Sequence, residues 1–134
     1  MTTARSTSRI AVMAVIAALG IVPVATGLLG IVRGPAGAPG GASTTPSVDS
    51  EYRFVNVFWA AAGVLLWWTL FRPEERARIT TGVLGLAAVG GLPRLLSWRT
   101  TGAPHPIFRG TVVLELVVVP AVMVWHSRAF RPAS

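Results

Sequence analysis

The chain has 134 residues, of which 52% are hydrophobic and 13% are charged, whereas charged residues make up roughly 25% of an average soluble domain. This composition favours a membrane protein and argues against a soluble enzyme domain. The formal charge of +7 comes from twelve basic residues, all arginine, against five acids.

These arginines are scattered between apolar runs and do not gather with aromatic residues into one surface, so we expect no nucleic-acid binding. The chain has no cysteine, and its two histidines, His105 and His126, have no second ligand at metal spacing. We therefore expect no thiol chemistry, no metal site and no cofactor.

The first predicted helix covers residues 10–32, a run of 23 residues without a charge. At about 1.5 Å per residue it measures roughly 34 Å, enough for a tilted crossing of a hydrocarbon core about 30 Å thick. Arg5 and Arg9 before an apolar run are also typical of a signal peptide. We favour an uncleaved helix, because the run is longer than a usual signal-peptide core and three more spans follow.

The second predicted span covers residues 54–71 and follows a loop, residues 33–50, that is rich in Gly, Pro, Ala and small hydroxyl residues. This composition predicts a flexible connection. Residues 49–51 (DSE) can cap the helix that follows. Arg53 marks the start of the span and Pro73 closes it, since proline cannot continue the helical hydrogen-bond ladder.

The third predicted span covers residues 79–98 and carries Arg94, and the fourth covers residues 107–125 and carries Glu115. The loop between them is short, which predicts antiparallel neighbours. The expected fold class is therefore all-α: a single integral membrane domain, residues 1–134, built as a bundle of four transmembrane helices.

Arginine counts predict the orientation of this bundle, because cytoplasmic loops collect arginine. With the N-terminus inside, four arginines lie at the outer ends, and the inner side holds Arg5, Arg9, Arg72, Arg76, Arg78, Arg128 and Arg131. We expect a multi-pass protein of the bacterial plasma membrane with both termini cytoplasmic.

In this orientation Arg94 lies about four residues, or roughly 6 Å, below the outer end of its helix. Glu115 lies about eight residues, or roughly 12 Å, below the same face. An arginine side chain can cover this difference in depth, so the sequence predicts an ion pair between them. Such a pair either fixes the register of two helices or belongs to a binding or transport site.

The same residues occur in a wider pattern. Ser50-Glu51-x-Arg53-Phe54 opens a helix, Arg94-x-x-Ser97 is followed by Gly102-x-Pro104, and Glu115 stands alone in the last span. Over residues 20–125 this resembles the family catalogued as domain of unknown function 4345. The resemblance implies a small bacterial protein of about four membrane helices without an assigned activity. The long Gly/Pro-rich loop departs from that pattern.

The resemblance and the depth of the charges together predict a polar cluster at the outer end of the bundle, lined by three helices. Its candidate members are Glu51, Arg53, Arg94, Ser97 and Glu115. The first hypothesis is an accessory or structural subunit that binds a lipid or a larger membrane complex through this cluster. The alternatives are a self-associating transporter that uses Glu115 as a proton or ligand site, and an enzyme that acts on a lipid or quinone. No GxSxG or HExxH motif is present, so we expect no catalytic residues and no enzyme.

Overall fold

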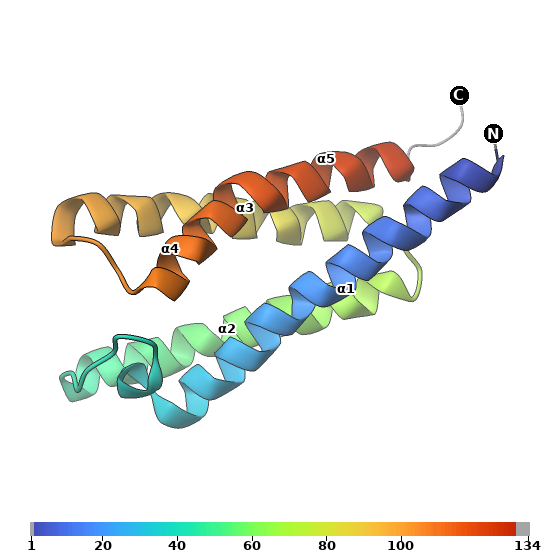
Figure 1. The fold of residues 1–134 in the computed structure, drawn as a ribbon. Coiled ribbons are helices and arrows are strands. Elements are labelled where there is room, and N and C mark those ends of the chain that lie inside the picture. Colours follow the sequence, from blue (N-terminus) through green and yellow to red (C-terminus); the bar gives the residue numbers. More distant parts are fainter. Residues whose placement is uncertain (1, 131–134) are drawn as a thin grey trace.

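The structure, a computed structural model, describes residues 2–130, and Arg131, one of the arginines counted for the inner side, lies outside them. Helices make up nearly all of the described chain, which contains no strand (Figure 1). Four segments are long and apolar enough to cross a membrane, namely Thr3–Arg33, Pro46–Leu70, Ala77–Thr101 and Pro106–Ala129. The predicted all-α fold with four membrane-spanning helices is therefore confirmed.

The four spans form two antiparallel hairpins. The first hairpin consists of α1 (Thr2–Arg33) and α2 (Pro46–Leu70), with a short 3-10 turn, η1 (Pro35–Gly37), between them. The second consists of α3 (Ala77–Thr101) and a continuous but irregular helix made of α4 (Pro106–Val113), the π-helical turn η2 (Leu114–Val118) and α5 (Val119–Ala129).

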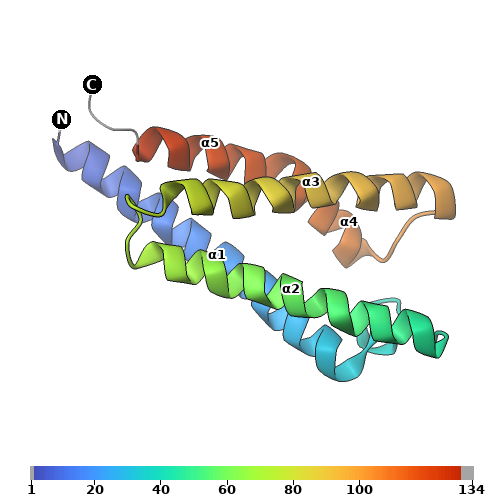
Figure 2. The same cartoon turned by 180° about the vertical axis from the view of Figure 1, so that it is seen from behind.

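The hairpins lie together at one end of the molecule and diverge toward the other (Figures 1 and 2). We call the end where the hairpins lie together the closed end. It carries the start of α1, the end of α5 and the connection 71–76. We call the end where they diverge the open end. It carries the loops 34–45 and 102–105. At the closed end α1 contacts α5, whereas within residues 2–130 neither α4 nor η2 has a backbone contact with α1 or α2.

The hydrophobic core lies where the hairpins meet. Val12 and Ile16 of α1 are fully buried there, and they belong to one cluster with Leu66, Leu84 and Val122. Most other large apolar side chains point outward along all four spans, including Phe54, Phe58, Leu86, Leu96 and Val117. A surface of this kind suits a hydrocarbon environment and would be costly in water. The chain is therefore a multi-pass membrane protein.

The second helix begins eight residues before the predicted start of its apolar run, at Pro46 instead of residue 54. Thr45 is its N-cap, and its hydroxyl accepts a hydrogen bond of 3.4 Å from the amide of Val48. Proline is well suited to the first helical position because it needs no hydrogen-bond acceptor there. The predicted flexible loop of residues 33–50 is therefore shortened to residues 34–45, part of which forms η1.

Glycine residues hold α1 close to α2. A Cβ atom at Gly63 would lie 2.7 Å from the carbonyl oxygen of Gly20, and one at Gly27 would lie 2.7 Å from the amide nitrogen of Ala60. Backbone approaches of this kind are the usual basis of helix association in membranes. Further along the contact, the indole of Trp67 donates a hydrogen bond of 2.9 Å to a carbonyl of α1.

Candidate functional site

Arg94 and Glu115 form the predicted ion pair between α3 and η2. Nε of Arg94 lies 3.1 Å from Oε1 and 3.0 Å from Oε2 of Glu115. Only Oε1 meets hydrogen-bond geometry, and Oε2 is buried without a hydrogen bond. The Glu115 side chain is 6% exposed, whereas that of Arg94 is 39% exposed. The carboxylate is therefore the interior partner, and the guanidinium reaches it from the surface of the hairpin.

The local backbone around Glu115 departs from a regular α-helix. The amide of Val119 bonds the carbonyl of Leu114, five residues back, where an α-helix would use Glu115. Pro120 comes next and has no amide hydrogen to take over. The backbone carbonyl of Glu115 therefore loses both of its possible helical donors, and the π-turn shifts the carboxylate around the helix axis. Such single-turn bulges occur often at functional sites.

Gly91 lets this π-turn approach α3. A Cβ atom at Gly91 would lie 2.7 Å from Cγ of Leu116 and 3.1 Å from Cβ of Glu115. Gly91 lies one helical turn before Arg94, so it brings the carboxylate within reach of the arginine on the same face.

Arg94 uses only one of its donor nitrogens within the described chain. Its guanidinium carbon lies 5.9 Å from the ring centroid of Phe108, near the limit for a cation–π contact. Nη1 and Nη2 have no hydrogen-bond acceptor among residues 2–130. An arginine held by Nε thus presents four N–H groups to a group from outside the chain.

Ser97 lies one turn beyond Arg94, but its hydroxyl is engaged locally. The hydroxyl of Thr101 donates to the carbonyl of Ser97 at 2.7 Å. The two hydroxyl oxygens lie 3.3 Å apart, and because the Thr101 proton is already used, Ser97 is the donor in that contact. Ser97 therefore adds no free donor to the site.

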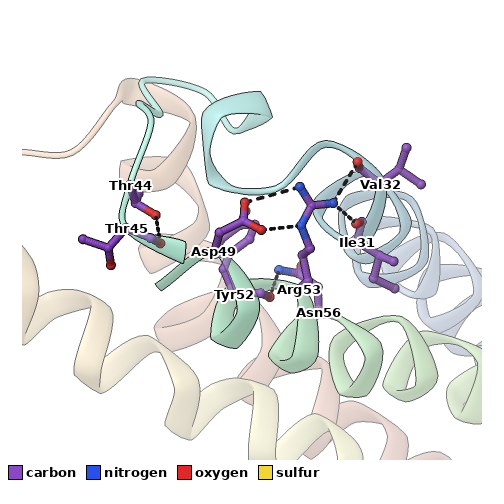
Figure 3. Close-up of polar contacts among 8 residues, drawn as sticks. All are labelled: Ile31, Val32, Thr44, Thr45, Asp49, Tyr52, Arg53 and Asn56. Carbon is purple, nitrogen blue, oxygen red and sulfur yellow. Dashed lines mark hydrogen bonds and ion pairs between the residues drawn. The ribbon is translucent and has the colours of Figure 1, made fainter. Parts of the chain in front are cut away.

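Arg53, by contrast, belongs to the other hairpin and turns toward α1. Figure 3 shows its guanidinium between Asp49 and the last carbonyls of α1. Nε lies 2.7 Å from Oδ2 of Asp49, and Nη1 donates to the carbonyls of Ile31 at 2.6 Å and Val32 at 2.9 Å. Arg53 is thus a C-terminal cap for α1, which satisfies otherwise unpaired carbonyls and favours a positive charge at that helix end.

The structure therefore divides the five predicted residues between separate places. Arg94, Ser97 and Glu115 lie on the α3–α4 side, and Arg53 lies between α1 and α2. Asn56, three residues after Arg53 on α2, packs against Gly30 and donates to a backbone carbonyl of its own helix. Glu51 is exposed. The expected pocket lined by three helices is not formed by these side chains.

Comparison with known proteins identifies the family of this chain. The family described as a domain of unknown function, DUF4345, matches residues 11–126. The chain belongs to this family. No curated protein and no solved structure matches it. The match includes both hairpins and therefore the Arg94–Glu115 pair and the Arg53 cap, and it confirms the resemblance drawn from the sequence.

Two features of this DUF4345 member were not predicted from its sequence. Asp49 was interpreted as a cap, whereas its carboxylate holds Arg53; the spacing of four residues on a helix is the signal for such a pair. Gly34 has a φ of 65°, which favours glycine. A Cβ atom there would lie 2.5 Å from Oδ1 of Asp49 and 2.7 Å from Nη2 of Arg53. Gly34 therefore leaves room for the cap.

Replacement of Arg53 by glutamine is expected to loosen the end of α1 without unfolding the bundle. The carbonyls of Ile31 and Val32 would lose their donor, and Asp49 would lose its counter-charge. Hydrogen exchange measured by mass spectrometry should become faster around residues 30–34 and stay unchanged at the closed end. Unchanged exchange near residue 34 would show that Arg53 does not cap α1.

Proposed function

We propose that this DUF4345 protein is a non-catalytic accessory or structural subunit of the bacterial plasma membrane. It binds an anionic group of a larger membrane complex or of a lipid, and Arg94 at the open end makes the contact. The observation that carries this proposal is that Arg94 is held through Nε alone, so its two terminal amino groups remain available. Glu115 orients the arginine and is not itself the ligand-binding group.

This division of roles explains why a carboxylate is kept inside an apolar helix. A buried ion pair adds little stability compared with well-packed apolar residues, but it can fix one geometry. A guanidinium that is fixed before binding loses less conformational freedom when it meets its ligand. Among the described residues no base lies beside Ser97, and the hydroxyl of Ser97 is bonded to Thr101. Both observations support a binding role over a catalytic one.

The proposal can be tested with Arg94→Lys, which keeps a positive charge beside Glu115 but removes the planar fork of donors. Arg33→Gln, an exposed arginine at the open end of the other hairpin, is the matched control. Tagged protein is isolated in mild detergent, and copurifying proteins and lipids are identified. We expect a stoichiometric companion with the wild type and the control, and its loss with Arg94→Lys. A bare monomer in all three samples would overturn the proposal.

We further propose that the closed end faces the cytoplasm, because it carries most of the arginines. The chain has no cysteine of its own, so single cysteines can report sidedness. A cysteine at Ser43 in the loop 34–45 should react with an impermeant maleimide added to intact cells. One at Glu75 in the connection 71–76 should react only after the membrane is permeabilised. The reverse pattern would invert the orientation.

One observation favours a second candidate, a self-associating proton carrier. Oε2 of Glu115 is buried without a hydrogen bond, and a carboxylate in that state can hold a proton without disturbing a network. Four helices are few for a transport path, so this function requires at least a dimer. Proton flux into vesicles that contain the protein, abolished by Glu115→Gln, would support it; cross-linking that yields only monomers would exclude it.

A further inference from the structure

The open end of the second hairpin carries an excess of positive charge that the first hairpin lacks. Glu115 is the only acid from residue 77 to residue 129, whereas Arg94, Arg99 and Arg109 all lie toward the open end of this hairpin. On the first hairpin, Arg33 and Arg53 are balanced in number by Asp49 and Glu51. At the open end, the electrostatic attraction for an anion is therefore concentrated beside α3 and α4.

Two arginines of this region, Arg99 and Arg109, lack the acidic partners that Arg9 and Arg72 have at the closed end. Arg99 and Arg109 are exposed, and neither side chain has a hydrogen bond or ion pair within residues 2–130. At the closed end, in contrast, Arg9 is paired with Glu74 and Arg72 with Glu75. The hollow that these four residues line with Met13 and Phe130 is thus already neutralised.

The depth of Arg94 decides what kind of anion can reach it. Arg94 lies seven residues before the end of α3, which corresponds to roughly 10 Å along the helix axis. Arg99 and Arg109 lie within about 5 Å of their helix ends on the same scale. The interfacial layer of each leaflet is about 5–8 Å thick, so Arg94 lies near the boundary between this layer and the hydrocarbon core. A ligand anchored in the membrane can approach this depth from the side.

Apolar side chains at the start of α4 lie beside Arg94 and suit the acyl chains of such a ligand. Phe108 lies beside the guanidinium, and Ile107, its neighbour in α4, is more than half exposed. Phosphate oxygens match the planar arginine fork in two-point hydrogen bonding. A phospholipid combines an anionic phosphate with apolar acyl chains, which match the arginine and the apolar side chains beside it.

Resting on the proposed function, we propose that the anionic group bound by Arg94 is the phosphate of an anionic phospholipid in the leaflet at the open end. The terminal amino groups of Arg94 bond the phosphate oxygens. Arg99 and Arg109 raise the local positive potential, which selects a lipid with net negative charge over a zwitterionic one. The ion pair with Glu115, which lies in the interior of the hairpin, holds Arg94 in place.

Native mass spectrometry of the detergent-purified protein tests this proposal. The probes are phosphatidylglycerol, phosphatidylcholine with the same chains, and inorganic phosphate. We expect one phosphatidylglycerol to bind at least tenfold more tightly than phosphatidylcholine. Arg94→Lys and the double change Arg99→Gln with Arg109→Gln should each weaken binding about tenfold, and Arg33→Gln should leave it unchanged. The double variant does not alter the partner of Glu115, so it remains informative if Arg94→Lys folds poorly.

Three results would overturn the lipid proposal in different ways. Equal binding of both lipids by the wild type and all variants would show that Arg94 does not select an anionic phospholipid. Displacement of phosphatidylglycerol by an equal concentration of inorganic phosphate would show a free-phosphate site. If lipid binding is unaffected by Arg94→Lys while a copurifying membrane protein is lost with that variant, the lipid inference fails and the accessory function stands.

Discussion

Replacement of Arg94 by glutamine is expected to lower the free energy of unfolding by about 3 kcal/mol, because it leaves the buried Glu115 carboxylate without a counter-charge. Glu115→Gln should cost less than about 1 kcal/mol, since the remaining Arg94 is partly exposed and can turn toward the headgroup layer. Both values can be measured by reversible denaturation in mixed detergent micelles. A larger loss for Glu115→Gln than for Arg94→Gln would contradict the assignment of Glu115 as the buried partner.

Replacement of Gly63 by alanine is expected to destabilise the first hairpin by about 2 kcal/mol, within the range found when atoms are added to a packed interior. The new methyl group would lie 2.7 Å from the backbone oxygen of Gly20 and 2.9 Å from the ring of Pro23. Neither atom belongs to a flexible side chain, so α1 and α2 would have to separate.

Gly82→Ala is the control for this change, because a Cβ atom there meets nothing within 4 Å. Alanine is also the better helix former, so this variant should be as stable as the wild type or slightly more so. Both variants are compared by the same denaturation measurement. Equal losses for Gly63→Ala and Gly82→Ala would mean that the close α1–α2 approach is not what stabilises the hairpin.

Much of this architecture follows from local patterns in the sequence. The length of each apolar run predicts a span, and Pro46 and Pro106 stand at the first turns of their helices as expected for proline. The ion pair of Arg94 with Glu115 could be predicted because two helices joined by a short loop must be antiparallel neighbours. Depth along each helix then follows from residue count alone.

The arrangement of the hairpins could not be predicted in the same way. Which face of α2 meets which helix depends on packing between distant segments, and the outward faces of all four helices are apolar as well. Arg53 was therefore assigned to one polar cluster with Arg94 and Glu115, whereas its helix turns it toward α1. The π-turn at Glu115 was also missed, although Pro120, five residues later, is the feature that indicates it.

The coupling energy between Arg94 and Glu115 tests most directly whether Glu115 holds Arg94 in place. The unfolding free energies of the wild type, Arg94→Gln, Glu115→Gln and the double variant form a double-mutant cycle. If Glu115 holds Arg94 in place, the double variant should recover most of the loss caused by Arg94→Gln, with a coupling of about 2 kcal/mol. Additive losses, within about 0.5 kcal/mol, would show that the two side chains act independently and would contradict the account.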